Sequence, residues 1–406
     1  MGARTTSRSS WSAWDPTRPF LRKIRLDPTF GSATFTNTST SKARLSVGLF
    51  GSKNKSLVGL DIGSSTVKVC ELQSSGKGAN QRYKLQKLGF APVSSDAIVD
   101  GDVMDSNAVA NAIRQVMAEQ KIKGKEVAIS LSGQQVMVKK VTFPLMSPAE
   151  LAESVRWEAE SFFPAGQGMD AYALDYDILE ERPSDGNMDV VLVACRKDKL
   201  EAYVSVVSQA GLVAKVVDVD VFALQNAHEA NAGTMGRDEV VALVNLGATF
   251  TNLSMIVGNR SVFWRDVSWG ASRFLDKIQE DWSVSREGAD QLLKGRPAEG
   301  HTPDEVQSSV RAVSEAFGDE LARTIDFFRS SFKVDRLDRV LLAGGGSMVH
   351  GLVEHLSDRL RVTVERFNPF QLIDVDPKSV DPAMVREVGS TAAVVVGLAL
   401  RQVGDR

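Results

Sequence analysis

Val58-Gly-Leu-Asp-Ile-Gly-Ser-Ser-Thr-Val-Lys-Val69 is the stretch that tells most about the fold of this chain. An apolar strand runs to Asp61, a Gly-Ser-Ser-Thr turn follows, and a second strand alternates Val67 and Val69 with polar residues. Gly63 permits a tight turn and a close approach of the backbone to a ligand. The pattern predicts a β-hairpin whose turn holds phosphate oxygens, although an ordinary hairpin with a glycine turn explains this segment alone equally well.

Two further segments support the phosphate interpretation. Residues 240–256 repeat the design, with Asn245 in the position of Asp61 (245 − 61 = 184 residues later) and Gly247 in the turn. Residues 339–352 combine a buried strand pattern with three glycines that open a helix, and a helix N-terminus favours phosphate. The three segments together predict two related half-domains that face each other across a nucleotide.

In this order, the segments resemble those of the actin-like ATPase superfamily, and the chain is most similar to its PilM family from type IV pilus assembly. The similarity covers residues 47–403 and is carried by the segment from Gly48 to Val69 and by Val217-Asp-Val-Asp-Val-Phe-Ala-Leu224, Phe263-Trp-Arg-Asp-Val-Ser-Trp-Gly270 and Glu320-Leu-Ala-Arg-Thr-Ile-Asp-Phe-Phe328. It implies an α/β, actin-like (ribonuclease H-like) duplicated fold with the extra subdomain that FtsA and PilM proteins carry.

The resemblance also implies a domain layout. We expect residues 47–137, 213–228 and 389–403 to form the first half, and residues 138–212 to form the inserted extra subdomain. Residues 229–388 would form the second half, with a smaller lobe at about 270–335 over the nucleotide. Within the insertion, Ser147, Pro148 and Glu150 predict a capping box at the start of a helix.

The first 46 residues differ from the rest of the chain. They contain sixteen Ser or Thr and eight Lys or Arg but two acidic residues, without sustained periodicity, so disorder is expected. A transit peptide and the loose myristoylation pattern at Met1-Gly-Ala-Arg-Thr-Thr6 are alternatives. The favoured hypothesis is a recorded start that lies too early, with translation beginning at the position of Val47.

Composition excludes several classes of function. The chain is 43% hydrophobic and 24% charged with a net charge of −3, which argues against nucleic acid as the main partner. Cys70 and Cys195 lie in apolar strand patterns and are expected to be reduced and buried, and the four histidines lack metal-ligand spacing. No apolar run reaches the ~18–20 residues that span a bilayer, and residues 391–400 suggest a buried helix.

The candidate site residues form a metal-and-phosphate set and a nucleoside set. In the first hairpin, the residues expected to hold phosphate are Asp61, Gly63, Ser64, Ser65, Thr66 and Lys68. In the second hairpin they are Asn245, Gly247, Ala248, Thr249 and Asn252. Asp61 and Asn245 are also the candidates for Mg²⁺. The resemblance implies that the nucleoside of ATP contacts Gly344, Gly345, Gly346 and Met348, and also Glu320 and Arg323, for which an exposed i,i+3 ion pair is the alternative.

Two further positions concern hydrolysis. Asp218 lies where a carboxylate could orient a magnesium-bound water, although a strand-end turn residue is an equally good interpretation. Asn245 departs from the aspartate that hydrolysing relatives usually have in this slot. An amide keeps a metal-facing carbonyl but loses the charge, which weakens both magnesium binding and a base role. We therefore expect ATP binding with slow or absent hydrolysis.

The resemblance implies a cytoplasmic adaptor rather than a metabolic enzyme. It would bind the N-terminal cytoplasmic segment of a PilN-like inner-membrane protein, link it to the pilus motor ATPases, and reach the inner face of the bacterial inner membrane through that partner alone. A helix face with Val155, Trp157, Phe162 and Phe163 is a candidate wall for the segment, with core packing as the alternative. A polymerising FtsA- or MreB-like ATPase and a small-molecule kinase are the alternative functions, and type II secretion or competence are alternative settings.

Overall fold

The computed structural model describes residues 57–76, 81–134, 136–162, 168–231, 239–258 and 260–403. The expectations for the head of the chain, and for Phe163, lie outside the described residues. A six-stranded sheet contains the first hairpin and has the order β10 (Val213–Val219), β6 (Glu126–Leu131), β1 (Val58–Ile62), β2 (Thr66–Ser75), β3 (Arg82–Pro92) and β16 (Ile373–Val375). β1, β2 and β3 are antiparallel neighbours, whereas β6 runs parallel to β1 and β10 parallel to β6.

A second sheet repeats this topology. Its order is β13 (Arg260–Val267), β12 (Thr251–Val257), β11 (Val240–Leu246), β14 (Arg339–Ala343) and β15 (Thr363–Arg366). β11, β12 and β13 are again antiparallel neighbours, and β14 and β15 are again added in parallel beside the first of them. Every residue of β1 and β11 is buried, because both strands lie inside their sheets. The expected duplicated α/β fold is confirmed.

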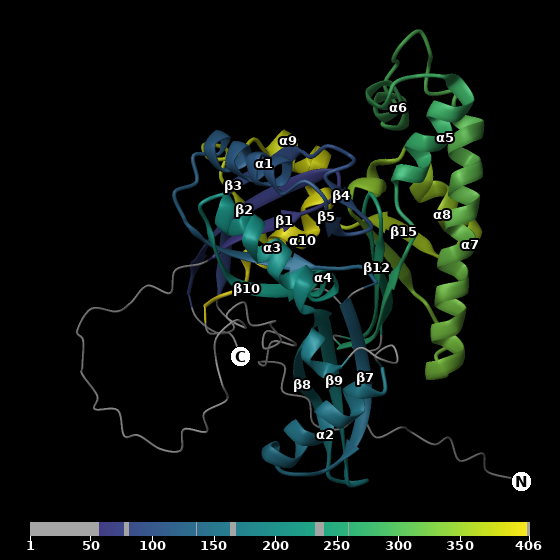
Figure 1. Cartoon of the computed structure of the whole chain (residues 1–406). Helices are drawn as coiled ribbons and strands as arrows, with labels where there is room; N and C mark the ends of the chain where they lie inside the picture. Colours follow the sequence, from purple (N-terminus) through teal and green to yellow (C-terminus); the bar gives the residue numbers. More distant parts are fainter. Residues whose placement is uncertain are drawn as a thin grey trace, which may run out of the picture.

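Helices cover the two sheets and also lie between them. α1 (Ser106–Glu119) and α3 (Lys197–Gln209) pack on the outer face of the first sheet. α4 (Asp220–Glu229) and α10 (Ala393–Ala399) share one hydrophobic core with residues of both sheets, so they fill the space between the halves. The outer face of the second sheet is covered by α5 (Ser272–Trp282), α7 (Gln307–Phe332) and α8 (Leu352–Leu360), with α7 along the right-hand edge of Figure 1.

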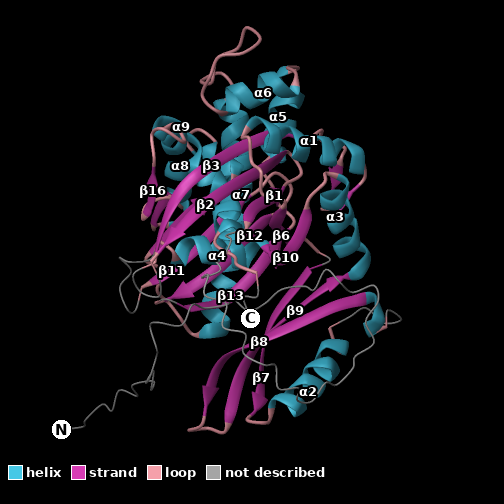
Figure 2. Ribbon diagram, turned by 90° about the vertical axis from the view of Figure 1, so that its left-hand side faces the viewer, coloured by secondary structure: helices cyan, strands magenta, loops and turns pink. Residues whose placement is uncertain are grey.

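A third, smaller sheet projects from the base of the two halves (Figures 1 and 2). It contains β7 (Val136–Pro144), β9 (Asn187–Arg196) and β8 (Tyr172–Arg182) in that order, and α2 (Pro148–Glu160) packs on it around a core of its own. The capping box of α2 is confirmed, since the Ser147 side chain accepts from the backbone N–H of Glu150 while the Glu150 carboxylate accepts from that of Ser147. This sheet is the structural counterpart of the inserted subdomain.

Its limits differ from the expected block of residues 138–212. α3 packs against α1, and β10 pairs with β6 of the first sheet, so the three-stranded sheet ends with β9 at Arg196. The second half also ends earlier than residue 388, because β16 pairs with β3. Between β15 and α10 lie β16, α9 (Pro382–Val388) and the short helix η4 (Gly389–Ala392).

The remaining elements are short. They are the strand pair β4 (Ile98–Val99) and β5 (Asp102–Val103), the helix α6 (Arg286–Leu293), and the single turns η2 (Met169–Ala171) and η3 (Gly345–Met348). Cys70 and Cys195 are both free and buried, as expected. One helical stretch, Pro382–Ala399, is long and apolar enough to cross a bilayer by length and composition, but 61% of it is buried inside the protein.

Candidate nucleotide site

The turns of the two mirrored hairpins meet each other. The Ser64 hydroxyl and the Thr249 hydroxyl form a hydrogen bond of 2.8 Å. Each turn is closed by the same backbone hydrogen bond, from Gly63 N to Thr66 O and from Gly247 N to Phe250 O. A Cβ on Gly63 or Gly247 would stand 3.0 or 2.9 Å from those carbonyl oxygens, so both turns require glycine. The two expected phosphate turns therefore lie face to face, with Ser65 and Thr66 in the first and Ala248 in the second.

The residues one position before the ends of β1 and β11 differ in charge. Asp61 faces Lys68 across the first hairpin, and the Lys68 ammonium donates to the Asp61 carboxylate at 2.7 Å. In the equivalent register position of the second hairpin, Asn245 faces Asn252, and the Asn245 amide donates to the Asn252 carbonyl at 2.8 Å. Asp61 and Asn245 are both nearly buried. The first hairpin thus has a charged pair, Asp61 and Lys68, where the second hairpin has a neutral pair, Asn245 and Asn252.

The acid cluster at the hinge involves Asp220 more than Asp218. The Asp218 carboxylate is fully buried and lies 3.3 Å from the guanidinium of Arg401, whose side chain is 1% exposed. Asp220 instead accepts a 2.5 Å hydrogen bond from Ser130. Burial, followed by repulsion from Asp61, raises the pKa of Asp220 to about 7. Asp220 is therefore the hinge carboxylate that shares an environment with Asp61, which sequence reasoning missed because it stands two residues from Asp218.

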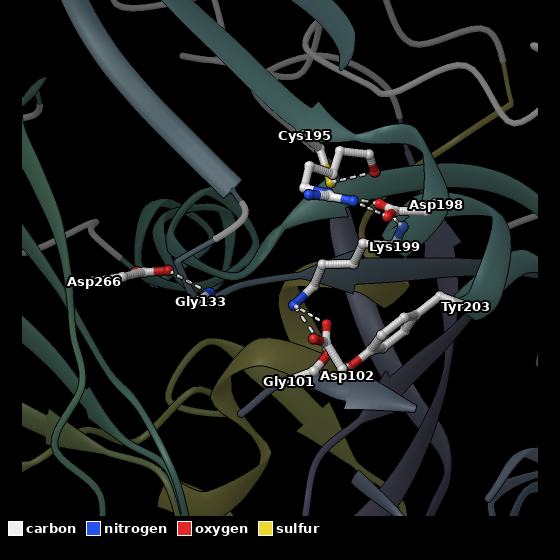
Figure 3. Close-up of polar contacts among 9 residues, drawn as sticks. Gly101, Asp102, Gly133, Cys195, Asp198, Lys199, Tyr203 and Asp266 are labelled. Carbon is white, nitrogen blue, oxygen red and sulfur yellow. Dashed lines mark hydrogen bonds and ion pairs between the residues drawn. The ribbon is translucent and has the colours of Figure 1, made fainter. Parts of the chain in front are cut away.

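A buried polar network joins the second hairpin to the first half. The Asn252 amide donates to one carboxylate oxygen of Asp266 at 2.8 Å, and the backbone N–H of Gly133 donates to the other at 2.9 Å. Burial raises the pKa of Asp266, while these hydrogen bonds act in the opposite direction. Figure 3 shows Asp266 directed at Gly133.

On the other side of Figure 3, a buried lysine approaches the same region from α3. The Lys199 side chain is 1% exposed, and its ammonium donates to the Gly101 carbonyl at 2.9 Å and lies 4.0 Å from the Asp102 carboxylate. Tyr203 donates to the same carbonyl at 3.1 Å. Burial lowers the pKa of Lys199, whereas the surrounding carboxylates, Asp220 and Asp266 among them, counteract this effect.

The glycine triplet continues the wall of the site from β14. Gly344 has a φ of 86°, and a Cβ there would stand 2.6 Å from the side-chain oxygen of Asn245. Gly346 packs against Leu246, while a Cβ on Gly345 would meet nothing within 4 Å. Met348 receives a weak hydrogen bond from Ser390 to its sulfur at 3.7 Å. Gly344 and Gly346 thus seat the loop beside the second hairpin, and Gly345 faces open space.

The two expected nucleoside contacts on α7 pair with each other. The Arg323 guanidinium donates to Glu320 at 2.6 Å, and the Arg323 side chain is 68% exposed. That is the geometry of the surface i,i+3 ion pair. His350, which follows η3, donates its backbone N–H to the Leu293 carbonyl at the end of α6, at 3.1 Å.

The donor set fits a metal that arrives with a ligand. Among the described residues, no group of three or more His, Cys, Asp or Glu side chains could hold a metal ion by itself. Asp61 and Asp220 nevertheless repel each other in a buried environment, which a divalent cation would relieve. The residues present therefore suit a cation that brings phosphate oxygens as its other ligands.

A cavity of about 230 Å³ lies where the three sheets meet. Its walls combine apolar side chains of β7, Val221 and Trp264 with the polar residues Gln134, Arg265, Asp266 and Ser268. Among the described residues, none accepts a hydrogen bond from the buried indole N–H of Trp264. Gly133 and Asp266 line this cavity and also belong to the polar network of the hairpins. The candidate wall on α2 has a different character, since Val155 is buried and Trp157 is 76% exposed.

Comparison with known proteins identifies the family. A solved structure described as the PilM-PilN type IV pilus biogenesis complex matches with a TM-score of 0.76 and 28% identity, over 86% of this chain and 98% of that chain. The ethanolamine utilization protein EutJ from Carboxydothermus hydrogenoformans matches at 16% identity and a TM-score of 0.48, over 85% of this chain and 89% of that chain. MreB5 of Spiroplasma citri bound to ADP matches at 12% identity and a TM-score of 0.43, over 84% of this chain and 94% of that chain. The family model for the type IV pilus assembly protein PilM matches residues 59–403. The chain, with its duplicated actin-like fold, therefore belongs to the PilM family of type IV pilus assembly proteins.

Proposed function

We propose that this chain is an ATP-binding adaptor of a type IV pilus assembly complex, with slow or absent ATP hydrolysis. The observation that carries the proposal is the contact of two mirrored glycine turns at Ser64 and Thr249, beside Asp61. Two such turns present backbone N–H groups and hydroxyls to one point, where phosphate oxygens accept hydrogen bonds. The match to a PilM protein solved with PilN supports the adaptor role.

Each residue has a defined task in this proposal. The backbone N–H groups and hydroxyls of residues 64–66 and 248–249 would bind the phosphates, with Lys68 as their cation, while the N–H groups of Gly63 and Gly247 close the turns. Asp61 and the side-chain oxygen of Asn245 would hold Mg²⁺, which supplies charge neutralisation at the phosphates when bound. Gly345 offers open space for the nucleoside, with Met348 nearby. Glu320 and Arg323 take part only if their mutual ion pair opens.

Asp220 rather than Asp218 is proposed to position a water molecule near the phosphates. Asp218 is engaged in a fully buried ion pair with Arg401, whereas Asp220 shares its electrostatic environment with Asp61. With a pKa of about 7, Asp220 is about half ionised at neutral pH and can accept a proton there. The expectation of slow turnover therefore rests on the neutral Asn245 alone.

The cavity at the junction of the three sheets is proposed to hold the partner segment. We propose that the segment is the N-terminal cytoplasmic stretch of a PilN-like inner-membrane protein. The apolar walls of the cavity suit hydrophobic side chains of an extended peptide. Binding there would bring this chain to the inner face of the inner membrane and to the pilus motor ATPases through the partner alone.

Two measurements test the proposal on the full chain. Calorimetric titration with Mg²⁺ and a non-hydrolysable ATP analogue should show one site, which Gly247→Val should abolish because the side chain would fill the turn. Single-turnover hydrolysis of ATP should be much slower than ~1 s⁻¹, the lower range of working enzymes. Absence of nucleotide binding, or hydrolysis at that rate or faster, would refute the corresponding part.

The partner is tested separately. A labelled peptide that copies the cytoplasmic N-terminus of the PilN-like protein should bind the full chain, and Met137→Lys should weaken binding because it places a charge on an apolar wall of the cavity. Met104→Lys, a substitution at an exposed methionine outside the cavity, is the matched control and should leave peptide binding unchanged. Equal binding by both variants would place the segment elsewhere.

A further inference from the structure

Three consecutive hydrogen bonds connect the nucleotide turns to the cavity. Asn245 donates to Asn252 at 2.8 Å, Asn252 donates to Asp266 at 2.8 Å, and Gly133 N donates to Asp266 at 2.9 Å. In this series of hydrogen bonds, Asn245 stands at the proposed metal site. Asp266 and Gly133, at the other end, line the cavity. Asn252 and Asn245 are buried, so water does not compete freely for these bonds.

The hydrogen bonds at Asn252 and Asp266 restrict how these two side chains can turn. Both carboxylate oxygens of Asp266 accept a hydrogen bond, one from each half of the molecule, so Asp266 cannot turn without leaving a buried donor unpaired. The Asn252 amide presents either its N–H or its carbonyl to Asp266, and the carbonyl orientation would repel the carboxylate. The state of Asn245 decides which orientation is favoured, because it donates to the Asn252 carbonyl.

The same turn reaches Gly133 by a second route. Phe250 follows Thr249, and a Cβ on Gly133 would stand 3.0 Å from the Phe250 ring. Gly133 has a φ of 94° and precedes β7, the strand that begins the third sheet. A shift of the second hairpin therefore moves both the ring that packs on Gly133 and the carboxylate that holds its backbone N–H.

We propose that Asp266 is a positioning residue that couples the nucleotide site to the cavity. This inference rests on the proposed function. A cation at the side-chain oxygen of Asn245 polarises the amide and strengthens its N–H donation to Asn252. That keeps Asn252 donating to Asp266 and holds Gly133 at the cavity rim. Nucleotide with metal should therefore tighten binding of the partner segment, and the segment should tighten nucleotide binding by the same factor.

The test measures a ratio of two affinities. Fluorescence anisotropy of a labelled PilN-like N-terminal peptide is titrated with the full chain, with and without Mg²⁺ and a non-hydrolysable ATP analogue. We expect about fivefold or greater tightening by nucleotide in the unaltered protein. Asp266→Asn offers one acceptor and one donor where two donors must be paired, so the ratio should fall to about one.

A matched control separates the coupling from general damage to the second sheet. The Ser254 and Ser261 hydroxyls form a buried hydrogen bond of 2.9 Å between the same two strands, β12 and β13, outside both the cavity and the three consecutive hydrogen bonds, so Ser254→Ala should keep the fivefold ratio. Asn252→Ser is too short to bridge its neighbours and should also reduce the ratio to about one. It serves as the second variant if circular dichroism shows that Asp266→Asn does not fold.

The outcomes distinguish this inference from the proposed function. If the unaltered protein binds neither ligand, the proposed function itself fails and the coupling falls with it. If it binds both ligands but the ratio is one, or if the folded Asp266 and Asn252 variants keep the ratio, the coupling is overturned while the adaptor role stands. A reduced ratio in Ser254→Ala would also overturn the assignment to Asp266.

Discussion

The first and second hairpins have the same backbone but different facing pairs. Both close with a glycine N–H bound to a carbonyl three residues on, and both turns meet at the Ser64–Thr249 hydrogen bond. In the first hairpin Asp61 is held by Lys68, whereas in the second Asn245 is held by Asn252. The difference in chemistry is therefore carried by side chains alone.

In the second half, a carboxylate lies on the strand next to the hairpin rather than in the hairpin itself. Next to the neutral pair, Asp266 on β13 accepts from Asn252 and from the first half. The second half thus keeps a carboxylate one strand away from the turn, where it holds the two halves together. We infer that the first hairpin is suited to bind a cation and the second to transmit a change in position.

The largest expected effect is on the free energy of unfolding, and it distinguishes a structural role of Asp218 from the proposed role of Asp220. Asp218→Ala leaves the fully buried Arg401 without its carboxylate, which typically costs about 3–5 kcal/mol of unfolding free energy. Urea unfolding followed by circular dichroism measures this loss. The double variant Asp218→Leu with Arg401→Met should recover most of it, because neither charge remains buried. A loss below about 1 kcal/mol would show that Asp218 is not a structural residue.

The next effect breaks the symmetry of the hairpins. Asp61→Ala removes the carboxylate proposed for the metal, and we expect about 2–3 kcal/mol weaker binding of Mg²⁺ with an ATP analogue. Asn245→Ala should cost less, because it removes a neutral group. Calorimetry measures both, with Glu71→Gln on the neighbouring strand β2 as control. Equal losses for both alanine variants would mean that the two slots are not different in function.

A smaller effect concerns the pH dependence of folding. The pKa of Asp220 in the folded protein is about 7, above its ordinary value of 3.8, so the folded state retains the proton between these values. Stability from this group is complete below about pH 4 and is lost as the pH rises towards 7 and above. Asp220→Asn removes this loss, so its stability relative to the unaltered protein should increase by about 1–3 kcal/mol between pH 5 and pH 8.

Chemical denaturation at several pH values measures that difference. Asp304→Asn, at a position exposed on the surface, is the control and should follow the unaltered protein at every pH. A constant offset between Asp220→Asn and the unaltered protein would contradict the raised pKa.

The smallest expected effect is on ATP hydrolysis, and it comes from giving the second hairpin the same acidic residue as the first. Asn245→Asp restores a carboxylate to the second slot and should raise single-turnover ATP hydrolysis about tenfold, which is ~1.4 kcal/mol in activation free energy. The increase is limited because Asn252 must turn its amide to meet the new carboxylate and then loses Asp266. Rapid-quench kinetics measures the rate. An unchanged rate with intact nucleotide binding would show that Asn245 does not limit hydrolysis.

The sequence predicted the parts of this molecule that depend on local patterns. Gly63 and Gly247 stand in matching contexts and predicted matching turns, and the Ser147–Glu150 capping box predicted the start of α2. The duplicated topology followed from these repeated patterns. The contact of the two turns was expected as well, since related halves that share a ligand must face each other.

The parts that the sequence could not supply depend on contacts between distant residues. Asp218 and Asp220 belong to one alternating run, and their surroundings are separated by Arg401 and Ser130, which lie far away in sequence. The expected block of residues 138–212 extends beyond the three-stranded sheet, because α3 is amphipathic in either setting and packs on α1. Asp266 lies in a segment that carries the family resemblance, but its contacts with Gly133 and Asn252 cannot be read from the sequence.

The close packing of α10 has a consequence for the synthesis of the protein. A Cβ on Gly397 would stand 1.7 Å from the Ala223 carbonyl oxygen, and one on Gly59 would stand 2.3 Å from the Val395 carbonyl oxygen. The last helix is thus wedged between the first strand of the chain and α4. On a ribosome, where chains emerge from the N-terminus onward, the half that begins first can be completed only after its final residues have left the exit tunnel. The strands β11 to β15 of the second half are synthesised before α10, so the second half can fold while the first half is still incomplete.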